Sequence, residues 1–386
     1  GTKDRGKKME IGRMVATSGE GIRPNIVIVL MESMSKANLS LHYKGKSLTP
    51  YLNQLAQSGY FFENFYSAGV HTNNGIVATL YSMPAQFNKR MMEDTHIPHY
   101  GGLPGQLQQL GYQTYFFVTG NPQYDSMNSF VRENNIEQVF SIYDYPKEKV
   151  VNNFGVQDDY LLQFGVDKLN EIDKSGKPFF ATFLTVSNHD PIVVPERFRH
   201  TGPTPKESII AFADNAIQQF MEGAKHQKWF SNTIFVFLGD HGAATGTQKY
   251  EMPLSYNQIP LIIYSPLLKD MPKRFSQFGG QIDVYPTLMG LLNQPYCNNT
   301  LGVDLLKEKR PCMFFVNDTE LGCINEHYLY ARNILTNKDF FYNLHYKDVR
   351  NVYSDTHPDA LALKKYAVSM MVTANYLREK NNPIRK

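Results

Sequence analysis

Short apolar runs that lack strict alternation of apolar and polar residues recur along most of the chain. They are rich in β-branched or aromatic residues and include Ile26–Met31, Gln113–Val118, Phe179–Val186, Thr233–Leu238 and Leu261–Tyr264. A strand that is buried on both faces has this pattern. Helix-like segments lie between the runs, at Pro50–Ser58, Leu103–Leu110, Asp158–Lys174, Lys206–His226 and Asp283–Leu292. This order predicts an α/β fold, a doubly wound sandwich around a mostly parallel central sheet.

The last part of the chain has a different pattern. Short runs at Cys312–Val316, His327–Asn333 and Phe340–Tyr346 indicate antiparallel strands, and Pro358–Arg378 indicates a helix. They predict a small α+β subdomain that closes one edge of the main sheet. We therefore expect a linker over residues 1–21, a catalytic domain over 22–310, and an antiparallel sheet with a helix over 311–386.

The net charge, the apolar runs and the cysteines argue against three kinds of protein: nucleic acid binders, proteins with a membrane-spanning helix in this sequence, and proteins with a thiolate metal site. The formal net charge of +3 is too small to indicate nucleic acid binding. No apolar run approaches the ~20 residues that span a bilayer. The three cysteines, Cys297, Cys312 and Cys323, form no CxxC pair, so a thiolate metal site is not expected. One disulfide with a free thiol and three buried thiols both remain open.

Polar residues follow two of the predicted strands, directly in one case and after a single glycine in the other. Glu32 follows Ile26–Met31, and Asp240 with His241 follows Thr233–Leu238. Ligands gather at the carboxyl ends of strands in open α/β sheets, so these side chains are candidates for holding a cation. Each also fits a structural role, the acid as a helix cap and the Asp-His pair as a turn.

Two further segments carry chemistry. Thr72 precedes the helix-like Ile76–Tyr81, where free backbone N–H groups and the helix dipole favour a phosphate or sulfate group. His189 follows the run Phe179–Val186 and is a candidate to contact the substrate or protonate a leaving group. A helix N-cap and a structural histidine are the alternatives.

Glu32, Thr72, Asp240 and His241 together offer three oxygens and one nitrogen for a single divalent ion. Carboxylates and a hydroxyl favour Mn²⁺ or Mg²⁺, and the imidazole also admits Zn²⁺. Coordination would lower the pKa of the threonine hydroxyl and make it a competent nucleophile.

The ordered motifs PNIVIVLMES, SAGVHTNNG, TVSNHDP, LGDHG, IPLIIYSP and DVYPTLMGLL, from Pro24 to Leu292, carry a family resemblance. The chain resembles the sulfatase-like branch of the alkaline phosphatase superfamily, of the lipoteichoic acid synthase and phosphoglycerol transferase type. This resemblance implies that Glu32, Thr72, Asp240 and His241 bind one catalytic metal, usually Mn²⁺. It further implies that Thr72 forms a covalent phospho-enzyme and that His189 contacts the substrate.

Two departures from the family pattern bear on the substrate. The CxPxR motif that matures to formylglycine is absent, and Thr72 holds the nucleophile position, which argues against ordinary sulfate-ester hydrolysis. Lipoteichoic acid synthases place a Trp and an Arg near the glycerophosphate. In the corresponding stretch Asn121–Met127, Tyr124 stands in place of the Trp and there is no Arg, which argues against glycerophosphate polymerisation.

The resulting hypothesis is a phosphotransferase or phosphodiesterase that acts on a phospholipid head group or an envelope glycan. The alternatives are a sulfatase that uses threonine instead of formylglycine, and an inactive domain that binds an envelope polymer. From the resemblance we expect the domain to lie on the extracytoplasmic side of the cell membrane, anchored by helices upstream of Gly1. We also expect a monomer, and the small net charge predicts no nucleic acid partner.

Overall fold

The computed structural model describes residues 11–87, 92, 96–246, 248–347 and 349–381. Among these residues the largest element is an eight-stranded sheet in the order β11-β5-β10-β9-β2-β8-β6-β7. In that order the strands span Lys273–Gly280, Tyr60–Tyr66, Leu261–Tyr264, Thr233–Gly239, Asn25–Met31, Phe179–Leu184, Gln113–Phe117 and Gln138–Phe140. Neighbouring strands are parallel except where β10 pairs with β5 and β9. The predicted α/β class with a mostly parallel sheet is confirmed.

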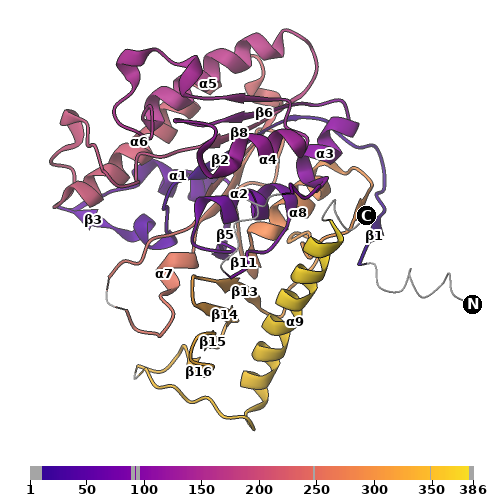
Figure 1. Cartoon of the computed structure of the whole chain (residues 1–386). Coiled ribbons are helices and arrows are strands. Elements are labelled where there is room, and N and C mark those ends of the chain that lie inside the picture. Colours follow the sequence, from indigo (N-terminus) through magenta and orange to yellow (C-terminus); the bar gives the residue numbers. More distant parts are fainter. Residues whose placement is uncertain (1–10, 88–91, 93–95, 247, 348, 382–386) are drawn as a thin grey trace, which may run out of the picture.

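Helices cover both faces of this sheet (Figure 1). On one face lie α1 (Pro50–Ser58), α5 (Asp158–Asp173) and α6 (Pro205–Lys225). On the other face lie α2 (Thr72–Tyr81), α3 (Gly102–Gln109), α4 (Met127–Glu133) and α8 (Val284–Leu292). Strand β2 explains why both faces need cover, because its successive side chains point in opposite directions. Its residues Ile26, Ile28 and Leu30 pack in one core, and Val27, Val29 and Met31 pack in the other.

The C-terminal part forms a second sheet with one long helix against it (Figure 1). Its antiparallel strands β13, β14, β15 and β16 span Met313–Val316, Glu320–Ile324, Tyr328–Asn333 and Lys338–Asn343. Helix α9 (Pro358–Lys380) packs on this sheet through Ala360, Leu363 and Ala367. The sequence predicted this arrangement without β14, a short strand that begins with a charged residue and contains Gly322.

Some elements were not predicted. Strand β5 carries Glu63 and Asn64 at its centre, and β11 lies at the sheet edge with a polar sequence. Strand β10 was predicted at Leu261–Tyr264, but it runs antiparallel to both neighbours, which was not expected. Within the range 1–21 that we expected to be a linker, β1 (Arg13–Val15) pairs with β12 (Tyr296–Asn298). Other short elements include β3 (His42–Tyr43), β4 (Lys46–Ser47), α7 (Leu254–Asn257) and several 3-10 helical turns.

All three cysteines are free thiols. Cys297 is exposed, whereas Cys312 and Cys323 are buried. The protein therefore has neither the disulfide nor the three buried thiols that the sequence left open.

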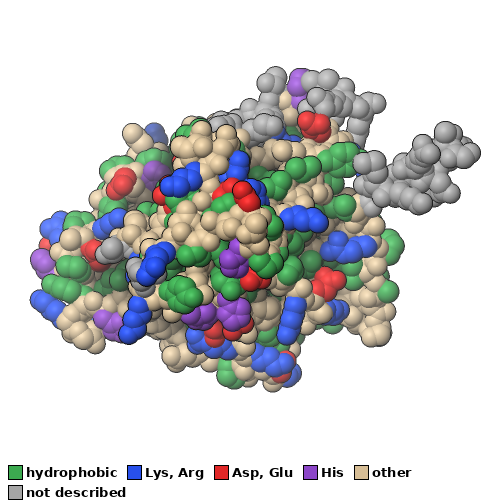
Figure 2. All heavy atoms as spheres, turned by 90° about the horizontal axis from the view of Figure 1, so that it is seen from below, with side chains coloured by type: hydrophobic (Ala, Val, Ile, Leu, Met, Phe, Trp, Pro, Cys, Tyr) green, Lys and Arg blue, Asp and Glu red, His purple; other side chains and the backbone are tan. Residues whose placement is uncertain are grey.

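Within the described ranges, no helix combines the length and apolar character needed to cross a bilayer. On the face in Figure 2, basic and acidic side chains are interspersed, in keeping with the net charge of +3.

Candidate active site

Two buried carboxylates lie side by side where β2 and β9 end. These strands are parallel neighbours, and their register pairs Met31 with Gly239. Glu32 and Asp240 are the next residues of the two strands, so the register brings them to the same sheet edge. Their exposed fractions are 5% and 0%. Such a pair of charges in a buried place requires compensation by hydrogen bonds or a cation.

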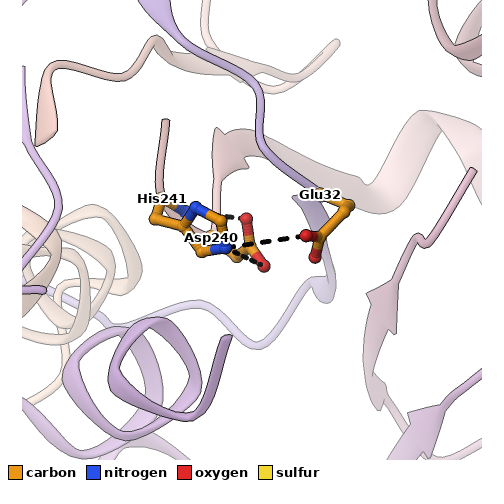
Figure 3. A group of neighbouring side chains, drawn as sticks. All are labelled: Glu32, Asp240 and His241. Atoms are coloured by element: carbon orange, nitrogen blue, oxygen red, sulfur yellow. Dashed lines mark hydrogen bonds and ion pairs between the residues drawn. The ribbon is translucent and has the colours of Figure 1, made fainter. Parts of the chain in front are cut away.

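His241 turns its ring toward both carboxylates (Figure 3). Its Nδ1 donates to the backbone oxygen of Gly242 at 2.6 Å. Its Nε2 lies 3.6 Å from Glu32 Oε1 and 3.5 Å from Asp240 Oδ2. A ring that donates from Nδ1 keeps its lone pair at Nε2, which is the tautomer that a metal-binding histidine needs.

Thr72 is the first residue of α2 and meets the same carboxylates. Its Oγ1 donates to Asp240 Oδ2 at 2.9 Å and to Glu32 Oε2 at 3.2 Å. The close approach of α2 depends on Gly75, because a Cβ at that position would lie 2.5 Å from the backbone oxygen of Asp240. The threonine hydroxyl therefore lies at the positive end of a helix dipole and beside two acids.

This donor set fits a divalent metal ion. The ligand atoms of Glu32, Asp240 and His241 all lie within 4.8 Å of one another. Burial raises the pKa of the Glu32 carboxyl well above its ordinary value, and the neighbouring Asp240 raises it further. Two adjacent carboxylates of this kind are favourable as anions only when a cation offsets their charge. Carboxylate oxygens with one imidazole suit Mn²⁺, Mg²⁺ or Zn²⁺.

Three residues that the sequence analysis did not identify hold the acids in place. The backbone N–H of Ser33 donates to Asp240 Oδ1, and the backbone N–H of Glu32 donates to Thr185 Oγ1, both at 2.9 Å. The Gln281 side chain donates to the backbone oxygen of Asp240 at 2.8 Å. Ser33 and Thr185 lie close to the ends of predicted strands, and this position could have identified them from the sequence. No feature of the sequence around Gln281 indicates its contact with Asp240.

A cavity of about 510 Å³ opens beside the cluster. Its wall includes Glu32, Thr72, His241 and His189, together with the polar side chains Ser33, His71, Thr119, Asn121, Asp125, Asn153, Thr185, Asn188 and Asp190. Two aromatic residues also line the cavity. Tyr124, 57% exposed, packs edge-on against Phe154 with ring centres 6.2 Å apart, and Phe154 contacts His189 at 4.4 Å.

The loop that carries His189 is fixed by a buried acid. Asp158, the first residue of α5, accepts the backbone N–H groups of Val186 and Ser187, each at 2.9 Å. Its own N–H donates to Ser187 Oγ at 2.9 Å. Burial raises the pKa of Asp158. The loop after β8 is therefore tied to α5, which places His189 on the cavity wall.

Of the five residues singled out from the sequence, the structure brings Glu32, Thr72, Asp240 and His241 into one cluster. It places His189 on the wall of the cavity that the cluster borders. The roles of these residues in binding a metal and in the reaction remain predictions.

Comparison with known proteins agrees with the resemblance read from the motifs. The Sulfatase family model matches residues 24–294. The lipoteichoic acid synthase-like protein YvgJ of Bacillus subtilis (strain 168) is 22% identical over 335 residues, which cover 80% of this chain and 54% of that protein. Lipoteichoic acid synthase 1 of the same organism is 26% identical over 320 residues, covering 74% and 48%. The chain thus spans about half the length of these curated relatives.

Solved structures share the fold over almost the whole chain. An alkaline phosphatase superfamily protein from Vibrio parahaemolyticus has a TM-score of 0.83 at 23% identity, covering 98% of this chain and 94% of that one. The lipoteichoic acid synthase LtaP from Listeria monocytogenes has a TM-score of 0.81 at 18% identity, covering 97% of both chains. The chain belongs to the Sulfatase family and is a sulfatase-like enzyme with the alkaline phosphatase superfamily fold.

Proposed function

We propose that this domain is a metal-dependent phosphotransferase that moves a phosphoglycerol-type head group from a lipid to an acceptor in the cell envelope, by single transfers rather than by polymerisation, because the Trp and Arg of the lipoteichoic acid synthases are absent from Asn121–Met127. The observation that carries the proposal is the position of Thr72 Oγ1, 2.9 Å from Asp240 and 3.2 Å from Glu32, at the start of α2 and on a 510 Å³ cavity. The lipoteichoic acid synthases among its relatives supply the substrate class.

The transfer would take two displacements at phosphorus. In the first, Thr72 Oγ1 bonds to phosphorus, the bond from phosphorus to the donor oxygen breaks, and that oxygen leaves as a hydroxyl after taking a proton. The Thr72 hydroxyl already donates to Asp240 Oδ2, so its proton has an acceptor at hand. In the second, an acceptor hydroxyl gives up its proton as its oxygen attacks phosphorus, the bond to Oγ1 breaks, and Thr72 takes up a proton in return.

Glu32, Asp240 and His241 would hold one divalent ion, with Thr72 Oγ1 as a further ligand, and Mn²⁺ is the ion we expect. Such an ion supplies charge that lowers the pKa of the hydroxyl and offsets the negative phosphoryl oxygens. The N-terminus of α2 would add its dipole to that field. His189 on the cavity wall would contact the substrate, and Tyr124 with Phe154 would form the apolar wall against the head group.

The direct test compares an aryl phosphodiester with an aryl sulfate on the same preparation. We expect release from the phosphodiester, loss of that activity on chelation, and its recovery when Mn²⁺ is added. Thr72→Ala should abolish turnover, and Thr72→Ser should retain part of it because serine keeps the hydroxyl. Faster release from the sulfate would favour a sulfatase, and an active Thr72→Ala variant would disprove the role of Thr72.

By resemblance to its relatives, we further propose that the protein is anchored in the cell membrane with this domain on the extracytoplasmic side. The domain itself is expected to be a monomer.

A further inference from the structure

The residue before Thr72 is held by the C-terminal sheet. His71 Nε2 donates to Asp318 Oδ1 at 2.6 Å, and the two residues are 247 positions apart in the chain. His71 lines the same cavity as Thr72. The side chains of His71 and Asp318 are 44% and 67% exposed, so their hydrogen bond contributes little to the free energy of unfolding. Because this hydrogen bond adds little stability but lies next to Thr72, we ask whether it acts on the position of Thr72 instead.

The backbone of His71 is fixed by α2. Its oxygen accepts the N–H of Asn74 at 3.0 Å and that of Gly75 at 3.3 Å. Its own N–H donates to the Asn74 side chain at 3.2 Å. His71 is thus bonded to the first turn of α2 through its backbone and to Asp318 through its ring. A shift of Asp318 would be passed to the helix turn that carries Thr72.

Asp318 is itself placed by a tight turn between β13 and β14. Asn317 Oδ1 accepts the N–H groups of Thr319 and Glu320 at 3.0 and 2.7 Å. The Asn317 N–H donates to the Glu320 backbone oxygen at 3.0 Å. These bonds leave the Asp318 side chain at the tip of a rigid turn that faces His71.

The end of β13 is also bonded to the segment that leads to Thr72. The Val316 N–H donates to the Ala68 oxygen at 3.0 Å. The Asn257 side chain donates to the Val316 oxygen at 3.0 Å and to the Ser67 oxygen at 3.4 Å. The C-terminal sheet is therefore bonded to residues 67–71 at several points, and Asp318 is the contact nearest Thr72.

We propose that Asp318 is a positioning residue for Thr72, acting through its hydrogen bond to His71, and that the C-terminal sheet thereby forms part of the active site. This inference rests on the proposed role of Thr72 as the nucleophile. Removal of the Asp318 carboxylate frees the His71 ring, widens the range of positions of the first turn of α2, and lowers the fraction of molecules in which Oγ1 is aligned for attack.

The test measures kcat and KM on an aryl phosphodiester for the purified, metal-loaded enzyme and its variants. We expect Asp318→Ala to lower kcat about tenfold, as loss of an orienting partner commonly does, with KM and Tm unchanged. Asp318→Asn keeps an oxygen that accepts the ring N–H, so its kcat should stay within about twofold of the wild type. Glu326→Ala, in the next turn of the same sheet, is the matched control and should change nothing.

A second measurement tests the pathway through His71. His71→Ala and the double variant His71→Ala/Asp318→Ala should lose as much kcat as Asp318→Ala alone, because the residues act as one unit. The inference is overturned if Asp318→Ala behaves like Glu326→Ala, if Asp318→Asn is as slow as Asp318→Ala, or if the two losses multiply. Thr72→Ala is run in parallel, and its activity would refute the proposed function whatever the Asp318 variants show.

Discussion

The surroundings of the Glu32 carboxyl favour a bound cation beside it. Its carboxyl lies beside Asp240, is buried, and has a raised pKa, and it accepts hydrogen bonds from Thr72 and Ser33. A residue with these neighbours is poorly accommodated as a bare anion and well accommodated beside a cation. A glutamate at an exposed strand end would be solvated as an anion and would not indicate a cation site.

Gly75 offers a residue-level prediction. A Cβ at this position would lie 2.5 Å from the Asp240 backbone oxygen, so Gly75→Ala must move the first turn of α2 away from β9. We expect kcat to fall roughly ten- to a hundredfold, because misplacement of a nucleophile by about 1 Å has that effect. Gly101→Ala is the control, since a Cβ there meets nothing within 4 Å. Unchanged kcat for Gly75→Ala would show that the close approach is not needed.

Residues that follow predicted strands could be found from the sequence, and residues that act from a distance could not. Glu32, Asp240 and His241 were identified because one apolar run ends directly before Glu32 and another ends at Leu238, with only Gly239 before Asp240. Asp318 gave no such signal, since its turn belongs to a different sheet and its contact with His71 exists only in the folded chain. Long-range contacts of this kind depend on topology, which local pattern does not contain.

At the scale of elements, Asp214 links two helices on one face of the sheet. It lies in α6 and accepts the N–H groups of Tyr51 and Leu52 at 3.1 and 2.8 Å, in the first turn of α1. It therefore supplies from outside the acceptors that α1 lacks at its N-terminus. Burial nevertheless raises its pKa to about 6.

This raised pKa predicts a pH dependence of stability. The unfolded chain loses the Asp214 proton near pH 4, whereas the folded protein retains it up to about pH 6. The folded state binds more protons over that window, so its free energy of unfolding should fall as the pH rises from 4 to 6. Asp214→Asn cannot ionise and should lack this component. Urea unfolding of both proteins at several pH values measures it, and a constant difference between them would contradict the assignment.

Helices and strands with a clear apolar pattern were predicted with nearly correct ends. The direction in which neighbouring strands pair was not predicted for β10. Strand β10 is as apolar as its neighbours, and nothing in its sequence distinguishes the antiparallel direction. Strands β5 and β11 were missed because polar residues interrupt β5 and dominate β11, which lies at the edge of the sheet. Strand β5 is buried on both faces apart from Glu63 and Asn64, and these two polar residues hide its apolar pattern, whereas most of β11 is exposed or half-buried.

At the scale of the whole molecule, Arg310 forms a buried ion pair within the main domain and also bonds to the C-terminal part. Arg310 Nε donates to Asp283 Oδ2 at 2.9 Å and Nη2 donates to Oδ1 at 2.5 Å. Its Nη1 donates to the Tyr366 hydroxyl of α9 at 3.0 Å. The side chains of Arg310 and Asp283 are 3% and 0% exposed. Both groups are almost fully removed from water, so each depends on the other.

We expect Arg310→Ala to lower the free energy of unfolding by about 3–5 kcal/mol, because it leaves a buried carboxylate without its partner. Arg310→Lys keeps the positive charge but cannot make the two parallel hydrogen bonds to Asp283. Its free energy of unfolding should therefore lie between those of the wild type and Arg310→Ala. Arg274→Ala breaks an exposed ion pair with Glu63 and should have no measurable effect. Urea unfolding tests all three. An Arg310→Ala protein as stable as the wild type would show that the backbone N–H groups of Gly280 and Val303, which also donate to Asp283, are enough to hold its carboxylate.

The most direct test of the central claim is peptide mass spectrometry of enzyme that is acid-quenched during turnover of a phosphodiester donor. The account predicts a phosphoryl-linked adduct on the peptide that contains Thr72, absent from the Thr72→Ala protein and lost when an acceptor alcohol is added before the quench. An adduct on a different residue, or full turnover by Thr72→Ala, would contradict it.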